Sequence, residues 1–294
     1  MSALYKHFRI SKQGFHSRLN REASRREEQL QLLEILKDIR EDHPRLSVRQ
    51  IYFMIKPKTM GRDEFERYCY GYGLKIMRKR SYIKTTDSRG VNRFSNLLLE
   101  IELITSINQV WVTDITYFRL IEQMWYLTFI LDLYSRSIVG YSASTSLRAE
   151  DTSLPALVMA KKNRKRDIFD NLIVHSDGGG QFYCREYLKL TSKANIRNSM
   201  CENVYGNTHA ERINGTIKND YLIPYAPANP KELHQKLDKA VYLYNNQRPH
   251  KSLGRYSPIA FEKATAKGTL QKTWKVCKKV ICKTKKHMNI SIED

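Results

Sequence analysis

Two aspartates in the second half of the chain follow patterns that could support metal-dependent chemistry. Asp114 lies in the middle of an apolar stretch, between Trp111 and Ile115. Asp177 follows the apolar residues 172–174 by a few positions and is itself followed by three glycines. A carboxylate within an apolar strand is costly unless it is paired or bound to a metal. Strand ends that open into glycine turns are also where α/β proteins place reactive groups.

A third acid, Glu211, lies in a stretch whose spacing predicts a helix with a polar, basic face. Asn214 and Lys218 fall on the same side of that helix as Glu211. Attack on a phosphodiester needs an activated hydroxyl and a stabilised leaving oxygen, and two Mg²⁺ ions about 3.5–4 Å apart provide both. Mg²⁺ prefers hard oxygen ligands. Carboxylates from two strands and one helix would therefore suit a pair of such ions.

Each acidic residue also has an ordinary interpretation. An Asp before glycines is typical of a turn, and a helical Glu is typically a solvated surface group. Asp132 ends a predicted strand, and we expect it to cap the turn to Arg136 rather than bind metal. His175 is expected to support the site, because two-metal chemistry needs no histidine base. Lys218 has the alternative of being a solvated surface lysine.

The segments around these acids predict a mixed α/β sheet. β-Branched and aromatic residues predict three consecutive strands, and helices and strands alternate after them. The predicted strands cover 109–120, 124–131, 137–143, 171–175 and 196–200, and the predicted helices cover 149–162, 185–194, 208–221 and 230–246. Asp151 is expected in the first turn of the helix over 149–162.

The first 80 residues predict helices only. Leu4, Tyr5 and Phe8 have helical spacing, and Ser11 can cap a second helix. The arrangement favours a helix-turn-helix as much as a plain hairpin. The residues of the second helix that would contact DNA are Lys12, His16 and Arg18.

A longer amphipathic helix is predicted over 24–41 and ends before Pro44. Its expected apolar side comprises Leu30, Leu33, Ile35, Leu36 and Ile39. Ser47 and Gln50 form a candidate capping box that begins a second helix-turn-helix, with another helix from about Arg62 to Gly71.

We therefore predict four regions along the chain. They are a helix-turn-helix DNA-binding region over 1–80, a linker over 81–104, a catalytic core over 105–265 and a basic tail over 266–294. The tail contains eight lysines between Lys267 and Lys286 and is expected to be a small strand pair or disordered.

The overall charge indicates a polyanionic partner. Lys and Arg total 51 against 30 Asp and Glu, a formal net charge of +21. Such an excess attracts nucleic acid, because neutralising phosphates releases counterions. No long uncharged apolar run predicts a membrane span. The five cysteines form no CxxC pair, which argues against a structural zinc site and for a reduced, cytoplasmic protein.

Three sequence blocks resemble the retroviral-integrase-like DDE superfamily, and most closely the IS3-type insertion-sequence transposases. Two further blocks, Asp132-x-x-Ser-Arg136 and Tyr244-Asn-Asn-Gln-Arg-Pro-His, are similar to that family as well. The three main blocks are Trp111-x-Thr-Asp-Ile-Thr-Tyr117, His175-Ser-Asp-Gly-Gly-Gly-Gln-Phe182 and Glu211-Arg-x-Asn-Gly-Thr-x-Lys218. The resemblance covers about residues 105–262.

This resemblance implies a ribonuclease-H-like fold with Asp114, Asp177 and Glu211 as catalytic metal ligands. It also implies two Mg²⁺ or Mn²⁺ ions, cleavage and joining of double-stranded DNA, and several subunits assembled on paired element ends at the bacterial nucleoid. In this family the chain is often joined by frameshift to an upstream DNA-binding protein. We expect DNA contacts from Asn214, Lys218, Arg212 and Arg248, in addition to those of the N-terminal region.

Two departures leave alternatives open. The interval between Asp177 and Glu211 is slightly short for the family, so Glu202 is a competing candidate for the third acid, although it lacks the residues that follow Glu211 in the motif. The His/Cys module of retroviral integrases is absent. Two other functions compete with a transposase: a DNA-binding regulator with an inactive nuclease-like domain, and a nuclease that cuts without joining.

Overall fold

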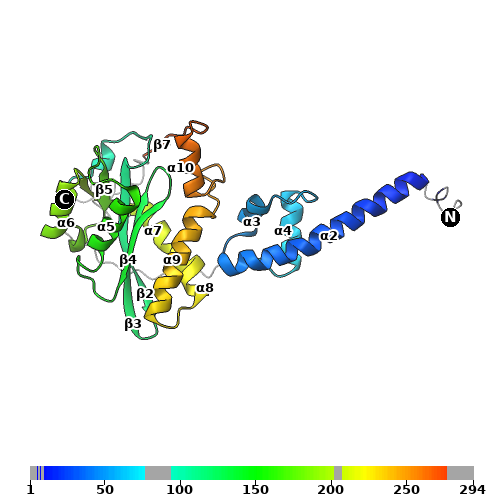
Figure 1. Ribbon diagram of the computed structural model, residues 1–294, viewed down its shortest axis with the longest axis horizontal. Helices are drawn as coiled ribbons and strands as arrows, with labels where there is room; N and C mark the ends of the chain where they lie inside the picture. Colours follow the sequence, from blue (N-terminus) through cyan, green and yellow to red (C-terminus); the bar gives the residue numbers. More distant parts are fainter. Residues whose placement is uncertain (1–4, 6, 8–9, 77–93, 202–206, 277–294) are drawn as a thin grey trace, which may run out of the picture. The chain divides into compact units, whose positions relative to one another are not determined.

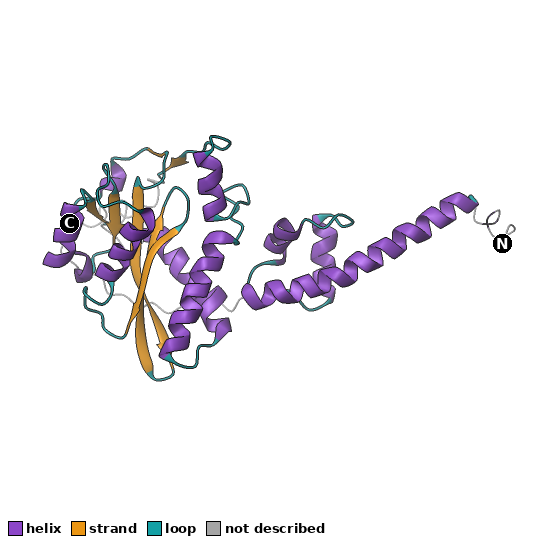
Figure 2. Ribbon diagram, in the orientation of Figure 1, coloured by secondary structure: helices purple, strands orange, loops and turns teal. Residues whose placement is uncertain are grey.

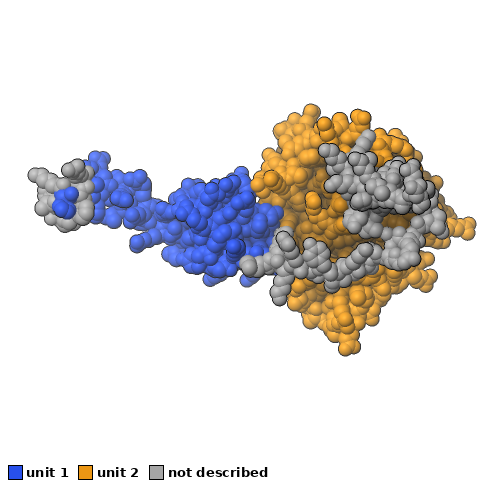
Figure 3. Space-filling view, turned by 180° about the vertical axis from the view of Figure 1, so that it is seen from behind, with its two compact units in different colours: residues 1–78 blue, residues 79–294 orange. Residues whose placement is uncertain are grey.

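The structure is a computed structural model that describes residues 5, 7, 10–76, 94–201 and 207–276. The chain divides into two compact units, residues 1–78 and residues 79–294 (Figure 3). We describe each unit by itself. In the described residues no helix is both long enough and apolar enough to cross a membrane.

The second unit is built on a central sheet (Figure 2). The sheet has five strands in the order β4-β3-β2-β5-β6. β2, β3 and β4 pair antiparallel, whereas β5 and β6 continue the sheet parallel to β2. The strands are β2 (Val110–Leu120), β3 (Gln123–Asp132), β4 (Ile138–Ser144), β5 (Ile173–Ser176) and β6 (Arg197–Met200). This order is that of the ribonuclease-H-like fold, which confirms the predicted fold class.

Helices cover both faces of the sheet (Figure 1). One face carries α5 (Ser153–Arg164) and α6 (Arg185–Lys193). The opposite face carries α7 (Thr208–Gly215), the π-helical segment η4 (Thr216–Leu222), α8 (Ile223–Tyr225) and α9 (Pro230–Asn246). An unpredicted helix, α10 (Pro258–Ala266), packs through Phe261 into the core on that second face. Asp151 lies in the turn before α5 rather than in its first turn, which corrects the prediction.

Alternation along β2 divides its side chains between the two cores. Val110 and Val112 face the core beneath α7 and α9, whereas Trp111 and Ile115 face the core beneath α5 and α6. Gly140 on β4 lets α5 pack directly on the sheet, because a Cβ there would lie 2.1 Å from the Ala156 carbonyl oxygen. β2 therefore presents its even-numbered residues, which include Asp114, to α7.

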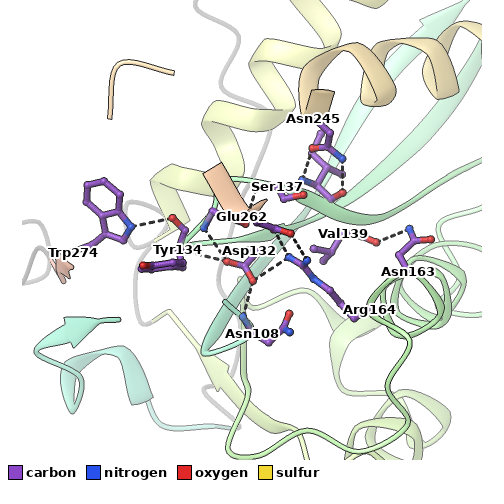
Figure 4. A network of polar contacts seen from close by, with 12 residues as sticks. Asn108, Asp132, Tyr134, Ser137, Val139, Asn163, Arg164, Asn245, Glu262 and Trp274 are labelled. Carbon is purple, nitrogen blue, oxygen red and sulfur yellow. Dashed lines mark hydrogen bonds and ion pairs between the residues drawn. The ribbon is translucent and has the colours of Figure 1, made fainter. Parts of the chain in front are cut away.

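A buried ion cluster fixes the end of β3 (Figure 4). The Asp132 carboxylate is fully buried and accepts from the backbone amides of Asn108, Tyr134 and Ser135. Arg164 at the end of α5 lies 3.3 Å from Asp132 and makes two 2.7 Å bonds to Glu262 on α10. Asp132 therefore has the structural role that the sequence predicts, and it also connects three elements.

A short two-stranded sheet brings together the segments on either side of the core. β1 (Leu103–Ile104) pairs antiparallel with β7 (Trp274–Lys275). The Trp274 indole donates to the Tyr134 carbonyl. The tail therefore contributes one strand, β7, and its partner β1 precedes the core instead of lying in the tail. Residues 277–294 of the tail lie outside the described residues.

The end of the predicted linker packs on the core. The 3-10 helices η1 (Leu97–Leu99) and η2 (Gly180–Phe182) are short, and Leu97 and Leu98 are buried. Phe94 packs against the core beneath α5 and α6. Residues 77–93, which include the first part of the predicted linker and the basic residues just before it, lie outside the described residues.

The first unit consists of α2 (Lys12–Asp42), α3 (Val48–Ile55) and α4 (Arg62–Gly71). Ser11 and Ser47 cap α2 and α3 through their side chains, as their positions predict. The core of this unit comprises Leu32, Leu36, Leu46, Val48, Ile51, Met60, Phe65 and Cys69.

The course of α2 corrects two predictions. A single helix of 31 residues replaces the predicted short helix and the separate helix over 24–41, because no Gly or Pro interrupts the chain between them. Leu30 and Ile35 are exposed rather than packed. Leu4 and Phe8, the first helix of the candidate helix-turn-helix, lie outside the described residues.

Candidate active site

Asp114 and Asp177 come from neighbouring parallel strands at the same level of the sheet. β2 and β5 pair Val110 with Ile173 and Val112 with His175. The same offset, continued by two residues, places Asp177 level with Asp114. Both are even steps from residues that face the core beneath α7, so their side chains belong to one face of the sheet.

α7 carries the third acid over that face. Its buried residues Ala210 and Ile213 pack into the core beneath it, and Glu211 lies in the first turn, exposed to solvent. Asn214, one turn further, donates from Nδ2 to Asp114 Oδ2 at 2.9 Å. The helix is therefore attached directly to the strand that bears Asp114.

The electrostatics show that the acids influence one another. Burial and the negative charges of Asp177 and Glu211 together raise the pKa of Asp114 to about 7, although hydrogen bonds from the Ile115 backbone amide and the Asn214 side chain act to lower it. Burial also raises the pKa values of Asp177 and Glu211. Carboxylates held together in this way disfavour their own ionisation, and a divalent cation would offset that cost.

Oxygen atoms without protein partners lie on the residues around the acids. Asn214 Oδ1 and Asn207 Oδ1 are buried and have no hydrogen-bond partner. Asn207 is attached to β2, because its amide donates to the Thr113 carbonyl at 2.8 Å. Asn214 binds the Asp114 carboxylate, so its unsatisfied oxygen is a hard ligand of the kind that fits Mg²⁺ or Mn²⁺ with its bound waters.

The carboxylates are not closed into a metal cage. In the part of the chain that the structure describes, no three His, Cys, Asp or Glu residues are close enough to hold an ion. The Asp114 oxygens instead accept from Ile115 N and Asn214 Nδ2, each at 2.9 Å. Asp177 Oδ1 accepts from Gly179 N at 3.1 Å. An ion would have to compete with these donors for carboxylate oxygens.

Neighbouring residues hold the backbone near Asp177. His175 is fully buried, and its Nδ1 lies 2.9 Å from Ser199 Oγ on β6. Burial lowers the pKa of His175 to about 4, so the ring is neutral, in keeping with the predicted supporting role. The Tyr183 hydroxyl donates to the Asp177 carbonyl. Glu202, the competing candidate for the third acid, lies outside the described residues.

Lys218 is held on the strand that bears Asp114. Its Nζ donates to Thr116 Oγ1 at 3.1 Å and to the Tyr117 carbonyl at 3.3 Å. Burial lowers its pKa, which the charge of Asp114 opposes. It is therefore not a solvated surface lysine. The predicted helix over 208–221 is present, and it is π-helical rather than α-helical from Thr216 to Leu222.

The other expected DNA contacts differ in exposure. Arg212 on α7 is exposed, as are Lys12, His16 and Arg18 on α2. Arg248 is buried and pairs with Asp220 at 2.6 Å, so it cannot reach DNA from this position. The expectation that Arg248 contacts DNA is therefore corrected. Arg248 would have to leave a buried ion pair to reach DNA, and breaking such a pair is costly.

The sequence did not indicate two residues beside the acids. Cys201 follows β6 and is buried, and its pKa is raised to about 12 by burial first and then by Asp177, Asp114 and Glu211. Arg136 ends the Asp132 turn, and its Nη1 lies 3.0 Å from His209 Nδ1 on α7. Arg136 is part of a quoted motif, but the sequence assigned it no role.

Comparison with known proteins identifies the family of this chain. Two sequence models of families described as "Integrase core domain" match residues 105–204 and 194–258. An "Insertion element IS600 uncharacterized 31 kDa protein" of Shigella sonnei is 31% identical over 266 residues, which cover 86% of this chain and 95% of the relative. The chain belongs to the IS3-type insertion-sequence transposase family.

Other relatives and solved structures are similar to parts of this chain. "Transposase InsF for insertion sequence IS3fB" of Escherichia coli is 32% identical to this chain over 66% of its length and 67% of the relative. The catalytic core domain of HTLV-2 integrase, solved with magnesium, is 20% identical and covers 53% of this chain and 96% of its own, with a TM-score of 0.44. A chain of a simian T-cell lymphotropic virus intasome, solved in complex with PP2A regulatory subunit B56 gamma, is 17% identical, with a TM-score of 0.47, and the match covers 69% of this chain and 67% of that chain.

The electrostatics of Asp114 predict that Asp114→Asn stabilises the metal-free protein. A raised pKa means that the folded state favours the neutral Asp114 carboxyl group. The wild type therefore loses stability as the pH rises from 3.8, the pKa of Asp114 in the unfolded chain, to about 7, its pKa in the folded protein. At pH 8 we expect a gain on the order of 3 kcal/mol in the variant. Asn214 can turn its amide, whose Oδ1 has no partner, to accept from the new side chain.

Urea unfolding followed by tryptophan fluorescence, at pH 4 to pH 8 in EDTA, measures this effect. Asp167→Asn, a fully exposed carboxylate, is the matched control and should change nothing. Mg²⁺ should stabilise the wild type more than Asp114→Asn. A variant that is less stable than the wild type at pH 8 would contradict the electrostatic argument.

Proposed function

We propose that this chain cuts and joins DNA strands at the ends of a mobile element, as a DDE transposase. The proposal rests on Asp114 and Asp177, each of which lies two residues past the last paired residues of the parallel strands β2 and β5, and on Glu211 of α7, whose charge raises the pKa of Asp114. The relatives named transposases support it. Acting on chromosomal DNA, the protein would belong to the nucleoid in a bacterial cytoplasm.

Asp114, Asp177 and Glu211 would hold two Mg²⁺ or Mn²⁺ ions. When bound, the ions activate the attacking hydroxyl and stabilise the leaving oxygen of the phosphodiester. Asn214 would orient the Asp114 carboxylate through its 2.9 Å hydrogen bond. Tyr183 and the buried His175 would fix the end of β5, so that Asp177 keeps its position relative to β2. Precise placement of this kind supports in-line attack.

Lys218 and Arg212 would position the DNA end. Lys218 uses two of its N–H groups on β2 and has a third for a phosphate oxygen. Because its stem is fixed by β2, the lysine loses little side-chain entropy when it binds. Arg212 is exposed on the same helix as Glu211. Both residues would contact the strand that leaves the acids.

A strand-transfer assay with a labelled element end, a target plasmid and Mg²⁺ tests the proposal. A transposase gives joined products, a nuclease gives cuts alone, and a regulator with an inactive domain gives binding alone. Joined products that need the divalent ion support the proposal. Cuts without joining, or binding without either, would reject it in favour of the corresponding alternative.

DNA binding should depend strongly on salt. The net charge of +21 motivates this, because each neutralised phosphate releases counterions. Six to ten phosphate contacts imply a loss of roughly 10³–10⁵ in affinity between about 50 and 200 mM salt. Fluorescence anisotropy with a fixed duplex measures the slope. A flat titration would remove phosphate contacts as the main source of affinity.

The N-terminal unit would recognise the element ends. Lys12, His16 and Arg18 are exposed on α2, where side chains can reach DNA without disturbing the core of the unit. Replacing all three by Ala should lower the preference for the element end over unrelated DNA by at least about tenfold, since lost base contacts cost about 1–3 kcal/mol each.

The control for this variant is a triple substitution by Ala of exposed basic residues in the other unit, Lys162, Arg166 and Lys189. It removes at least as much charge, and any loss of long-range attraction should be equal for the two DNAs, so their ratio should stay unchanged. Competition binding with the two duplexes gives the ratio. An unchanged ratio in the α2 variant would place recognition elsewhere in the chain.

Assembly is part of the proposal. Joining two element ends to one target requires several subunits on DNA, and an upstream DNA-binding protein, separate or fused by frameshift, would complete the complex. Light scattering of the protein with paired end duplexes gives the number of subunits. A single subunit per end pair would exclude this arrangement.

A further inference from the structure

Arg136 is presented by a turn built around a buried acid. Asp132 Oδ1 accepts from the amides of Tyr134 and Ser135, and the Arg136 amide donates to the Asp132 carbonyl at 2.8 Å. Arg136 itself has a φ of 61°, in the left-handed region that favours glycine. A bulky residue there is retained against a steric cost of about 1–2 kcal/mol. Such a position suggests that the side chain has a function.

The Arg136 guanidinium has a nitrogen partner and an aromatic one but no acid. Nη1 lies 3.0 Å from His209 Nδ1, and the guanidinium carbon lies 5.8 Å from the centre of the Trp274 ring. Because arginine can only donate, His209 must accept through an unprotonated Nδ1 and is therefore uncharged. Neither neighbour neutralises the arginine.

Two other largely buried arginines of this unit, unlike Arg136, are paired with carboxylates. Arg164 makes two 2.7 Å bonds to Glu262, and Arg248 lies 2.6 Å from Asp220. Arg136 has no carboxylate within ion-pair distance among the residues that the structure describes. The acid that comes nearest in the chain, Asp132, is already paired with Arg164.

A second cation acts on Arg136. Arg212 is one turn beyond His209 on α7, and its charge, like burial, lowers the pKa of Arg136, whereas Tyr244 and Asp132 raise it. His250 lies near both Arg136 and Arg248, is neutral, and has a buried Nε2 without a partner. Two arginines whose charges repel each other beside α7 would be stabilised by an anion between them.

We propose that Arg136 and Arg212 together bind one backbone phosphate of the DNA strand that passes Glu211. The inference rests on the proposed function, which supplies the phosphate diester. Arg136 donates from the guanidinium N–H groups that His209 does not use, and Arg212 closes the phosphate from the solvent side. A planar guanidinium held from behind by Trp274 and His209 fits two phosphate oxygens at once. Arg136 is thus a positioning residue for the DNA end.

Arg136→Gln in the full-length protein tests this inference, with Arg166→Gln as the matched control. Arg166 is exposed and follows α5, on the opposite face of the sheet from α7. Affinity for an element-end duplex is measured by anisotropy in EDTA over a series of salt concentrations. We expect Arg136→Gln to lose on the order of tenfold in affinity and to reduce the salt slope by about 1, as for one lost phosphate. Arg136→Lys should restore the slope but only part of the affinity.

A merely structural Arg136 gives a different result. Arg136→Gln would then lower the melting temperature while its DNA affinity and salt slope matched those of Arg166→Gln, and the inference would be overturned. These binding measurements contain no metal, so they do not depend on whether the protein joins DNA. A failed strand-transfer assay would reject the proposed reaction and leave the reading of the phosphate contact unchanged.

The wild-type protein supplies a second measurement if Arg136→Gln does not fold. Phenylglyoxal modifies accessible arginines, and peptide mass spectrometry locates each adduct. DNA should protect Arg136 and Arg212 severalfold while Arg166 reacts equally with and without DNA. Equal modification of Arg136 in free and DNA-bound protein would overturn the inference.

Discussion

Asp114→Asn, Asp177→Asn and Glu211→Gln should each slow strand joining by at least about a thousandfold while the protein stays folded. Each exchange keeps the shape of the side chain and removes a charge that holds an ion, and the ions contribute several kcal/mol to the reaction. Single-turnover joining of a pre-cleaved element end, in saturating Mg²⁺, measures the effect. DNA affinity in EDTA should stay within a few-fold of the wild type, because these acids do not contact phosphates directly.

Glu202→Gln is the control for the third acid. Glu202 precedes α7 in the chain, whereas Glu211 lies in the first turn of α7. Asn214, which donates to Asp114, is one helical turn beyond Glu211. Near-normal joining in Glu202→Gln beside an inactive Glu211→Gln supports the assignment. The opposite pair of results would transfer the role to Glu202, and near-normal joining in either aspartate variant would remove that residue from the site.

Arg164→Met should destabilise the second unit by about 3–5 kcal/mol, the usual cost of leaving a buried charge without its partner. Asp132 is fully buried and Glu262 is 14% exposed, so water cannot replace the guanidinium between them. The three tryptophans of the chain, Trp111, Trp125 and Trp274, all lie in this unit. Urea unfolding followed by tryptophan fluorescence therefore reports on this unit alone.

Arg148→Met is the matched control for that measurement. Its pair with Glu150 is 3.4 Å long, and the two side chains are 77% and 51% exposed. Exposed pairs contribute about 0–1 kcal/mol, so this variant should stay close to the wild type. If Arg164→Met lost no more than Arg148→Met, the backbone amides alone would be sufficient to hold Asp132.

The sheet and the acids could be predicted because their signals are local. Alternating apolar residues around Asp114 fix both the strand and the face on which its carboxylate lies. Asp177 is placed by the short apolar run before it, and the equal level of the two aspartates follows once the strands pair in parallel. The cap residues Ser11 and Ser47 were predictable for the same reason, since a helix start depends on residues within one turn.

Other features depend on partners distant in the chain. Arg248 reads as a free cation in the sequence, but Asp220, 28 residues earlier, neutralises it in the core. The π-helical turns after Gly215 were not predicted, because no residue type in this segment distinguishes a π-helix from an α-helix. α2 continues where two helices were predicted because local sequence gave no reason for it to stop.

The β1–β7 pair has a consequence for how the second unit could be rewired. It places residues 103–104 beside residues 274–275, so a short linker could join the two flanks of the core. The turn after β2 contains Ile121, which is 74% exposed and has a φ of 54°, and it lies at the far end of the β2–β3 hairpin. A circular permutant opened at that turn would retain each strand pair of the five-stranded sheet. Its β2 and β3 would then meet from opposite ends of the chain, with Asp114 near the new carboxyl terminus and the Asp132 turn near the new amino terminus.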